Sequence, residues 1–98
     1  MPDTCTKYVP LGTVIMSPEL GYDIQHNERL GKYVHECLAR YRNCDWGETN
    51  DKGKAMNTAA LQSGGMIVSD YESPVFHRIR FVTNYERSQT VIMYPHEY

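Results

Sequence analysis

The stretch LGKYVHECLARY, residues 30 to 41, decides the fold of this sequence. Its apolar and aromatic residues recur every three or four positions, which is the period of one face of an α-helix. That face comprises Leu30, Tyr33, Val34, Cys37, Leu38 and Tyr41. Asn27 is suited to cap the helix start, and Glu28 follows in the first turn, where the helix dipole favours an acid. We therefore predict an amphipathic helix over residues 28–42, with one face on the core.

A second helix is predicted beyond a polar turn. Asn50 is a suitable N-cap, and the helix should run from about residue 51 to residue 61, before Gly64 and Gly65 stop it. Its inward side chains are expected to be Met56, Ala59 and Ala60.

The rest of the chain has the signals of β-structure. Strands are predicted at residues 13–16, 66–71, 75–83 and 90–94. Alternation in the third strand places Val75, His77, Ile79 and Phe81 toward the helices and Phe76, Arg78, Arg80 and Val82 away from them. Short connections favour an antiparallel meander. The predicted class is α+β, with a short N-terminal strand, two helices and then a three-stranded antiparallel β-meander packed against the helices.

Length and composition set further limits. At 98 residues the chain is expected to form a single domain, 1–98, with an irregular N-terminal arm at residues 1–12. A net charge of −2 gives no support to polyanion binding by bulk charge. No apolar run reaches the roughly 18 residues that a membrane span needs. The N-terminus lacks a basic-then-apolar leader, so we expect a cytoplasmic protein without a membrane partner.

No catalytic group stands out. Cys37 lies on the buried helix face, and Cys44 lies beside Asp45 near a helix C-terminus, where negative charge disfavours a thiolate. The four histidines have no metal-binding spacing. We therefore expect no enzymatic activity, no metal and no cofactor. A small hydrolase remains the third alternative, and it would need Glu86, His96 and Glu97 to converge.

Binding is the better-supported class of function. Arg78 and Arg80 on one strand face, with Arg87 in the next loop, could hold phosphate or a partner's carboxylates. The simpler interpretation is the solvated outer face of a sheet. Tyrosine and arginine are enriched in protein interfaces. The candidate partner-binding residues are Arg78, Arg80, Tyr85, Glu86, Arg87 and Tyr98.

The only tryptophan, Trp46, lies in the polar stretch NCDWGETND, residues 43 to 51. Its ring could serve as a ligand platform, as a partner anchor or as part of the core. It stands between the two predicted helices, where a large ring can pack against both. Asp45 and Gly47 can supply a side-chain hydrogen bond to the backbone and a permissive φ. We predict a structural corner made of Asp45, Trp46 and Gly47.

Three blocks of the sequence are similar to a known family. DWGETNDKGKAMNTAALQSGG, IVSDYE and RFVTNYERSQTVIMYPHEY resemble an uncharacterised family of small proteins from bacterial plasmids, integrative elements and phages. That family follows the pattern D-W-G, N-x-x-A-L-x-x-G, D-R-S-x-T and P-x-E-Y, and the resemblance covers most of residues 11–98. The shared residues are Asp45, Trp46, Gly47, Asn57, Ala60, Leu61, Gly64 or Gly65, Ser69, Tyr71, Thr83, Arg87, Ser88, Thr90, Pro95, Glu97 and Tyr98. The chain departs from the pattern at Asn84 and Glu86, and the family's sheet tryptophan is absent.

The resemblance implies an accessory gene of a mobile element. Our leading hypothesis is therefore a non-enzymatic interaction protein of a phage or other mobile element, with a host defence or replication protein as its partner. In its sharpest form it is an inhibitor of a host defence nuclease, of the anti-CRISPR or anti-restriction type. The alternative is a small nucleic-acid-binding regulator that uses Arg78, Arg80 and Arg87.

Overall fold

The computed structural model describes residues 8–97. In chain order the elements are β1 (Thr13–Met16), α1 (Pro18–Gln25), α2 (Glu28–Arg42), α3 (Asp51–Ser63), β2 (Ile67–Tyr71), β3 (Ile79–Thr83), β4 (Gln89–Met93) and the 3₁₀ turn η2 (Pro95–Glu97). The α+β class is confirmed. The finer prediction was only partly right, because the described residues hold three α-helices and one four-stranded mixed sheet of order β1-β4-β3-β2.

The N-terminal strand belongs to this sheet. β1 pairs with β4 in parallel, with Val14 beside Thr90 and Met16 beside Ile92, whereas β4, β3 and β2 pair antiparallel as expected. A local sequence pattern cannot reveal a pairing between segments so far apart in the chain. The helix α1 was also missed. Ser17 ends β1 but then caps α1, with its Oγ accepting from the Leu20 N–H at 3.3 Å.

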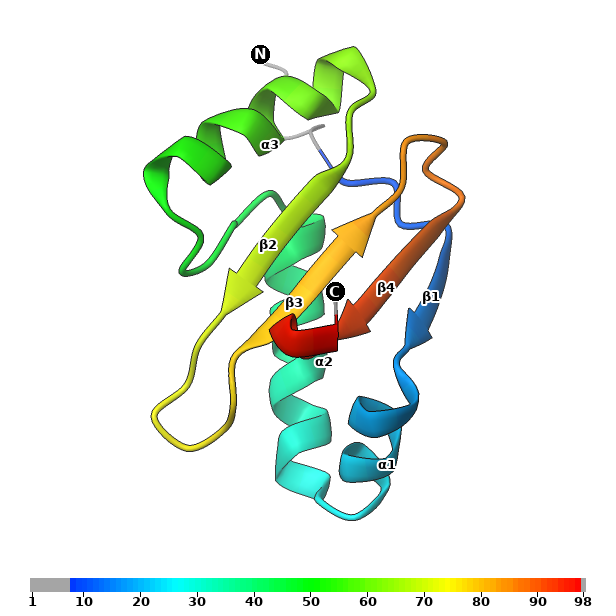
Figure 1. Cartoon of the computed structure of the whole chain (residues 1–98), viewed down its shortest axis with the longest axis vertical. Helices are drawn as coiled ribbons and strands as arrows, with labels where there is room; N and C mark the ends of the chain where they lie inside the picture. The colour runs from blue at the N-terminus through cyan, green and yellow to red at the C-terminus, as the bar shows by residue number, and fades with distance from the viewer. Residues whose placement is uncertain (1–7, 98) are drawn as a thin grey trace.

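Helix α2 covers the inner face of the sheet, as Figure 1 shows. It has the predicted bounds, and Asn27 caps it by accepting from the Leu30 N–H at 3.2 Å. The buried side chains of its predicted face pack with those of the sheet in one core. That core includes Leu30, Val34, Cys37 and Tyr41 from α2 and Ile67, Tyr71, Ile79, Phe81 and Ile92 from the strands.

Helix α3 packs differently from the prediction. Asn50 caps its start and Gly64, at φ 89°, ends it, both as expected. Its buried residues, however, are Asn57 and Ala60, while Met56 and Ala59 are exposed. The reason is that α3 lies along the outer edge of β2 (Figure 1) rather than over the inner face, so its contact side meets backbone groups of β2 and carries a polar residue.

Strand β3 is shorter than predicted. It begins at Ile79, opposite Tyr71, and residues 72–78 form the connection from β2. His77 is exposed and Val75 is 65 % exposed, so neither lies on the core face. Phe76 instead turns toward α2, and its ring lies 5.5 Å from the ring of Tyr33. The alternating residues before Ile79 therefore imitate a strand without forming one.

Candidate binding surface

The outer face of the sheet is largely uncovered. Figure 1 shows α2 behind the sheet and α3 beside β2, and among the described elements η2 is the one in front of the strands. Four apolar residues, one from each strand, are in register across this face: Val68 beside Val82, Val82 beside Val91, and Val91 beside Ile15. This set is called the apolar row below. An uncovered sheet face with a continuous apolar row is suited to contact a partner.

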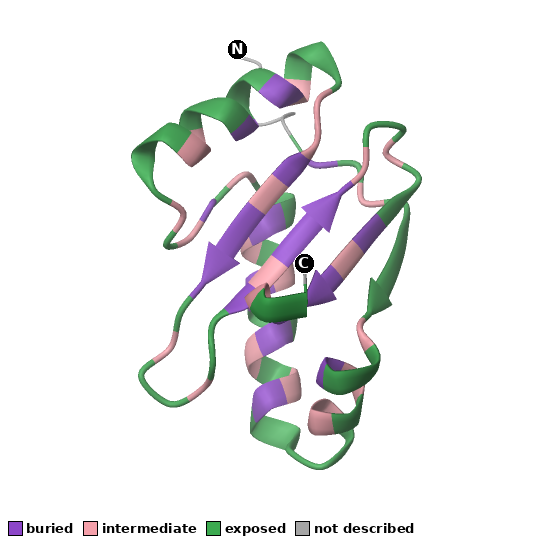
Figure 2. Ribbon diagram, viewed as in Figure 1, coloured by how far each residue is buried: buried purple, intermediate pink, exposed green. Residues whose placement is uncertain are grey.

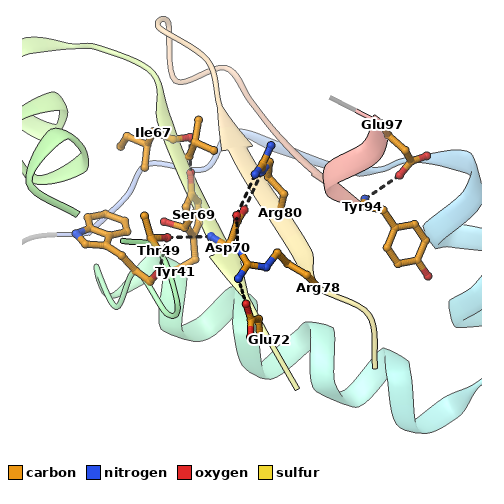
Figure 3. Close-up of polar contacts among 12 residues, drawn as sticks. Tyr41, Thr49, Ile67, Ser69, Asp70, Glu72, Arg78, Arg80, Tyr94 and Glu97 are labelled. Atoms are coloured by element: carbon orange, nitrogen blue, oxygen red, sulfur yellow. Dashed lines mark hydrogen bonds and ion pairs between the residues drawn. The ribbon is translucent and has the colours of Figure 1, made fainter. Parts of the chain in front are cut away.

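An ion cluster lies next to the apolar row. Arg80 Nε donates to Asp70 Oδ1 at 2.7 Å and its Nη2 donates to Oδ2 at 3.0 Å, while Arg78 Nη1 donates to the same Oδ2 at 3.0 Å. Arg78 also pairs with Glu72. Figure 3 shows both guanidinium groups directed at Asp70, that of Arg80 from the neighbouring strand β3 and that of Arg78 from the residue just before it. The two arginines singled out from the sequence are therefore close together, but they already bind a carboxylate of the chain.

Asp70 is the centre of the cluster and is only 8 % exposed. Burial by itself raises the pKa of this carboxyl, but the hydrogen bonds and charges of Arg80 and Arg78 outweigh it and hold the pKa below the usual value. The carboxylate is thus ionised and fixes the direction of both guanidinium groups. The side chain of Arg78 is 40 % exposed, and its Nη2 pairs with Glu72.

A pocket adjoins the cluster between α3 and the outer face. It has a volume of about 510 Å³. Its wall contains charged, polar and apolar side chains, among them Glu48, Met56, Asn57, Val68, Asp70 and Arg80. Met56 is 62 % exposed at its rim. Such a pocket can accept one side chain of a protein partner beside the apolar row.

The polar corner between α2 and α3 is built around a buried ring. Trp46 is 6 % exposed. Its ring packs edge-on against the Tyr41 ring, with the two ring centroids 6.0 Å apart, and its Nε1 donates a hydrogen bond to Thr58 Oγ1 at 3.4 Å. Asp45 Oδ1 accepts from the Gly47 N–H at 3.1 Å, and Gly47 has φ 63°. A side chain at Gly47 would collide with the Tyr71 ring. These contacts give Trp46 a packing role and leave little of its ring for a ligand.

Helix α3 and the segment before it close the free edge of β2. Asn57 Nδ2 donates to Val68 O at 2.8 Å, and the Val68 N–H donates to Asn57 Oδ1 at 3.1 Å. Further along the edge, the Asp70 N–H donates to Thr49 Oγ1 at 3.0 Å, and the Glu48 N–H donates to Asp70 O at 2.9 Å. Figure 3 shows Thr49 beside Asp70. The backbone groups that this strand turns outward are thus bonded to the chain itself.

Arg87 has a structural role. Its Nη1 donates to Gly65 O at 2.7 Å and to Asn84 O at 2.9 Å, and its Nη2 donates to Ala60 O at 2.8 Å. Arg87 therefore joins the C-terminal end of α3 to the loop between β3 and β4. Its own backbone in that loop is in the left-handed region, with a φ of 59°. Its guanidinium is occupied rather than presented to a ligand.

The predicted partner-binding residues do not form one site. Arg80 lies in β3 and Arg78 directly before it, whereas Tyr85, Glu86 and Arg87 lie in the loop after its end. Tyr85 and Glu86 are exposed there. Tyr98 lies outside the described residues. The structure therefore brings together only the pair Arg78 and Arg80.

The groups considered for catalysis are also apart or occupied. Glu86 and Glu97 lie beyond opposite ends of β4. Glu97 Oε1 accepts from the Tyr94 N–H (Figure 3) and from Ser17 Oγ, both at 2.8 Å. Burial raises the pKa of the Cys37 thiol to about 11, which disfavours a reactive thiolate. Within residues 8–97, no three His, Cys, Asp or Glu side chains are placed to hold a metal ion.

Two residues of this surface were missed by sequence reasoning. Asp70 was assigned to a predicted strand without a role of its own. Aspartate is unusual within a strand, and a half-buried carboxylate there needs a cationic or hydrogen-bonding partner. Asn57 was passed over for its apolar neighbour Met56. Asn57 lies three residues before Ala60, so the two share a helix face, and this spacing is the signal that would have identified it.

Comparisons with protein-family models, with curated proteins and with solved structures found no match to this chain. Among the described helices, none is both long and apolar enough to cross a lipid bilayer.

Proposed function

We propose that this chain is a non-catalytic interaction protein that binds a protein partner through the outer face of its sheet. The observation that carries the proposal is the apolar row, which none of the described α-helices covers and which the ion cluster of Asp70, Arg78 and Arg80 borders. An apolar centre with a polar rim is the usual composition of a protein interface.

The genetic setting implied by the sequence resemblance suggests the partner. We propose a host defence nuclease, which the chain would inhibit in the manner of an anti-CRISPR or anti-restriction protein. Held by Asp70, the cations of Arg78 and Arg80 have fixed positions and can contact acidic groups of the nuclease without further ordering. Inhibition then follows if the bound chain covers the surface on which the nuclease holds its nucleic acid.

A nucleic-acid-binding regulator has less support. The three arginines that it would use each donate to acceptors of the chain: Arg78 and Arg80 to Asp70, and Arg87 to backbone carbonyls. The net charge of −2 adds no general attraction to phosphates. A regulator would bind a DNA duplex at low salt, with an affinity that falls steeply as salt is added. We expect no duplex binding at low salt.

The proposal is tested in hosts that carry one defined defence nuclease each. Expression of the chain is expected to raise phage plating on at least one such host, and the purified chain should block target cleavage by that nuclease. Val91→Lys places a charge in the apolar row and should abolish both effects. Val75→Lys, at an exposed residue of the β2–β3 connection, is the matched control and should leave both intact.

Thermal unfolding of both variants shows whether a loss of effect reflects misfolding. Unchanged plating on every host, together with uninhibited cleavage, would reject the nuclease as partner. Equal inhibition by folded Val91→Lys would reject the outer face as the binding surface.

A further inference from the structure

The two edges of the sheet differ in how their backbone groups are used. The edge of β2 is closed by Asn57, Thr49 and Glu48, as described above. The opposite edge is β1, which forms the margin of the sheet in Figure 1, and no described strand pairs with its outer side. Open edges invite pairing with another chain and are normally blocked. We propose that two copies of this chain pair antiparallel through β1 and form a two-fold dimer.

The outward groups of β1 are defined by its pairing with β4. The N–H groups of Thr13 and Ser17 donate to Ser88 O at 3.0 Å and to Ile92 O at 2.9 Å. In a parallel ladder alternate residues bond to the same neighbour, so Ile15 also bonds inward. The N–H and C=O groups of Val14 and Met16 consequently point away from the sheet.

One antiparallel register satisfies all of these groups. With Val14 of one copy opposite Met16 of the other, the two residues exchange both backbone hydrogen bonds, and the two-fold axis repeats the exchange. The axis passes between Ile15 and its counterpart, which form a non-hydrogen-bonded pair with side chains close together. In this register Ile15, midway between Val14 and Met16, lies opposite Ile15 of the second copy.

The chemistry of the strand fits a second copy. Thr13–Met16 contains no charged residue, so self-pairing brings no like charges into opposition. Val14, Ile15 and Met16 are 38 %, 41 % and 42 % exposed, and Figure 2 shows the strand as an exposed margin of a buried sheet. Ile15 also ends the apolar row, so pairing would continue that row across the axis into the second copy. No charged side chain in the strand selects a partner of opposite charge.

The contact is short. Four residues span only about 13 Å at the usual rise of a strand. An interface of this length is small for a permanent dimer, so we expect a dimer that forms and dissociates in the micromolar range or above.

The test is sedimentation of the purified chain from about 1 µM to about 1 mM, with reversible dimerisation expected over this range. Ile15→Lys and Ile15→Glu should each be monomeric, because like charges would meet on the axis. Mixing the two variants should restore a dimer, because opposite charges then meet. Ile15→Thr is the matched variant that keeps β-propensity, and it should still dimerise.

Val14→Pro is a second test, and it leaves all four residues of the apolar row unchanged. It removes an outward N–H but no bond to β4, and proline is tolerated at such edge positions. Dimerisation should weaken at least tenfold. A monomer at every concentration would overturn the proposal, even if the strand binds an added peptide. A dimer that is insensitive to Ile15 and Val14, or a charge-paired mixture that stays monomeric, would overturn it equally.

Discussion

The side-chain amide of Asn57 holds both outward backbone groups of Val68, donating to its C=O at 2.8 Å and accepting from its N–H at 3.1 Å. Asn57, a residue of α3, thereby makes the two hydrogen bonds that a neighbouring strand would otherwise make to Val68. It is 3 % exposed, and its Nδ2 lies 3.1 Å from Ser69 Oγ. This pairing fixes α3 against β2 and so positions the pocket on the outer face.

Asn57→Asp should destabilise the chain. The carboxylate would oppose the C=O of Val68 and would remove one donor, leaving a buried backbone carbonyl unpaired. Loss of such a bond costs about 1–3 kcal/mol, and more where a charge is buried. Chemical denaturation measures the free energy of unfolding. Met56→Ala, one position earlier and 62 % exposed, is the control and should change it by less than about 0.5 kcal/mol. Equal stabilities for Asn57→Asp and wild type would contradict the bridging role.

The ion cluster predicts a dependence of stability on pH. The folded pKa of Asp70 lies below its usual value of 3.8, so its carboxylate stabilises the folded state above that pH. This contribution is lost as the pH falls through the lower, folded pKa. Asp70→Asn should therefore be less stable than wild type near neutral pH, and the difference should shrink as the pH falls from about 5 to about 2. Denaturation midpoints over this range provide the measurement.

Glu36→Gln, at an exposed position on α2, serves as the control for that pH series. Its stability difference from wild type should be small throughout. A difference for Asp70→Asn that stayed constant with pH, or that grew on acidification, would show that the arginines do not depend on an ionised Asp70.

Arg87 is expected to act on stability rather than on binding. Arg87→Ala removes the donors to Ala60 O, Gly65 O and Asn84 O, and should lower the free energy of unfolding by about 1–3 kcal/mol. Arg87→Lys should recover only part of the lost free energy of unfolding, because one ammonium group cannot donate in the several fixed directions of a planar guanidinium. Thermal unfolding gives the ranking, with exposed Arg29→Ala on α2 as control. If the Arg29 and Arg87 variants are equally stable, the loop does not rely on this residue.

Much of the helical structure could be predicted from the sequence because its signals are local. The period of α2, the caps Asn27 and Asn50 and the stop at Gly64 each depend on residues within one or two turns. The place of β1 could not be predicted, since it follows from a parallel pairing with β4 at the other end of the chain. The alternation of residues 75–78 wrongly predicted that β3 begins at residue 75. In the structure this segment is not a strand, and Phe76 packs against Tyr33 instead.

The candidate site was predicted in part for a related reason. Arg78 and Arg80 were identified as a charged stripe, but their partner Asp70 lies across a strand pair whose register the sequence did not specify. Once Asp70 is opposite Arg80, the stripe becomes a bonded cluster instead of a free cationic face. Tyr85, Glu86 and Arg87 were grouped with it by residue type alone, although a full strand separates them from Arg78.

The most direct test of the central claim is the affinity of purified wild-type chain for the nuclease that it inhibits, compared by calorimetry with Val91→Lys and Val75→Lys. If the outer face binds the partner, Val91→Lys should weaken binding at least tenfold, and Val75→Lys less than twofold, with both variants folded. An unchanged affinity for Val91→Lys would contradict the claim that the apolar row is the binding surface.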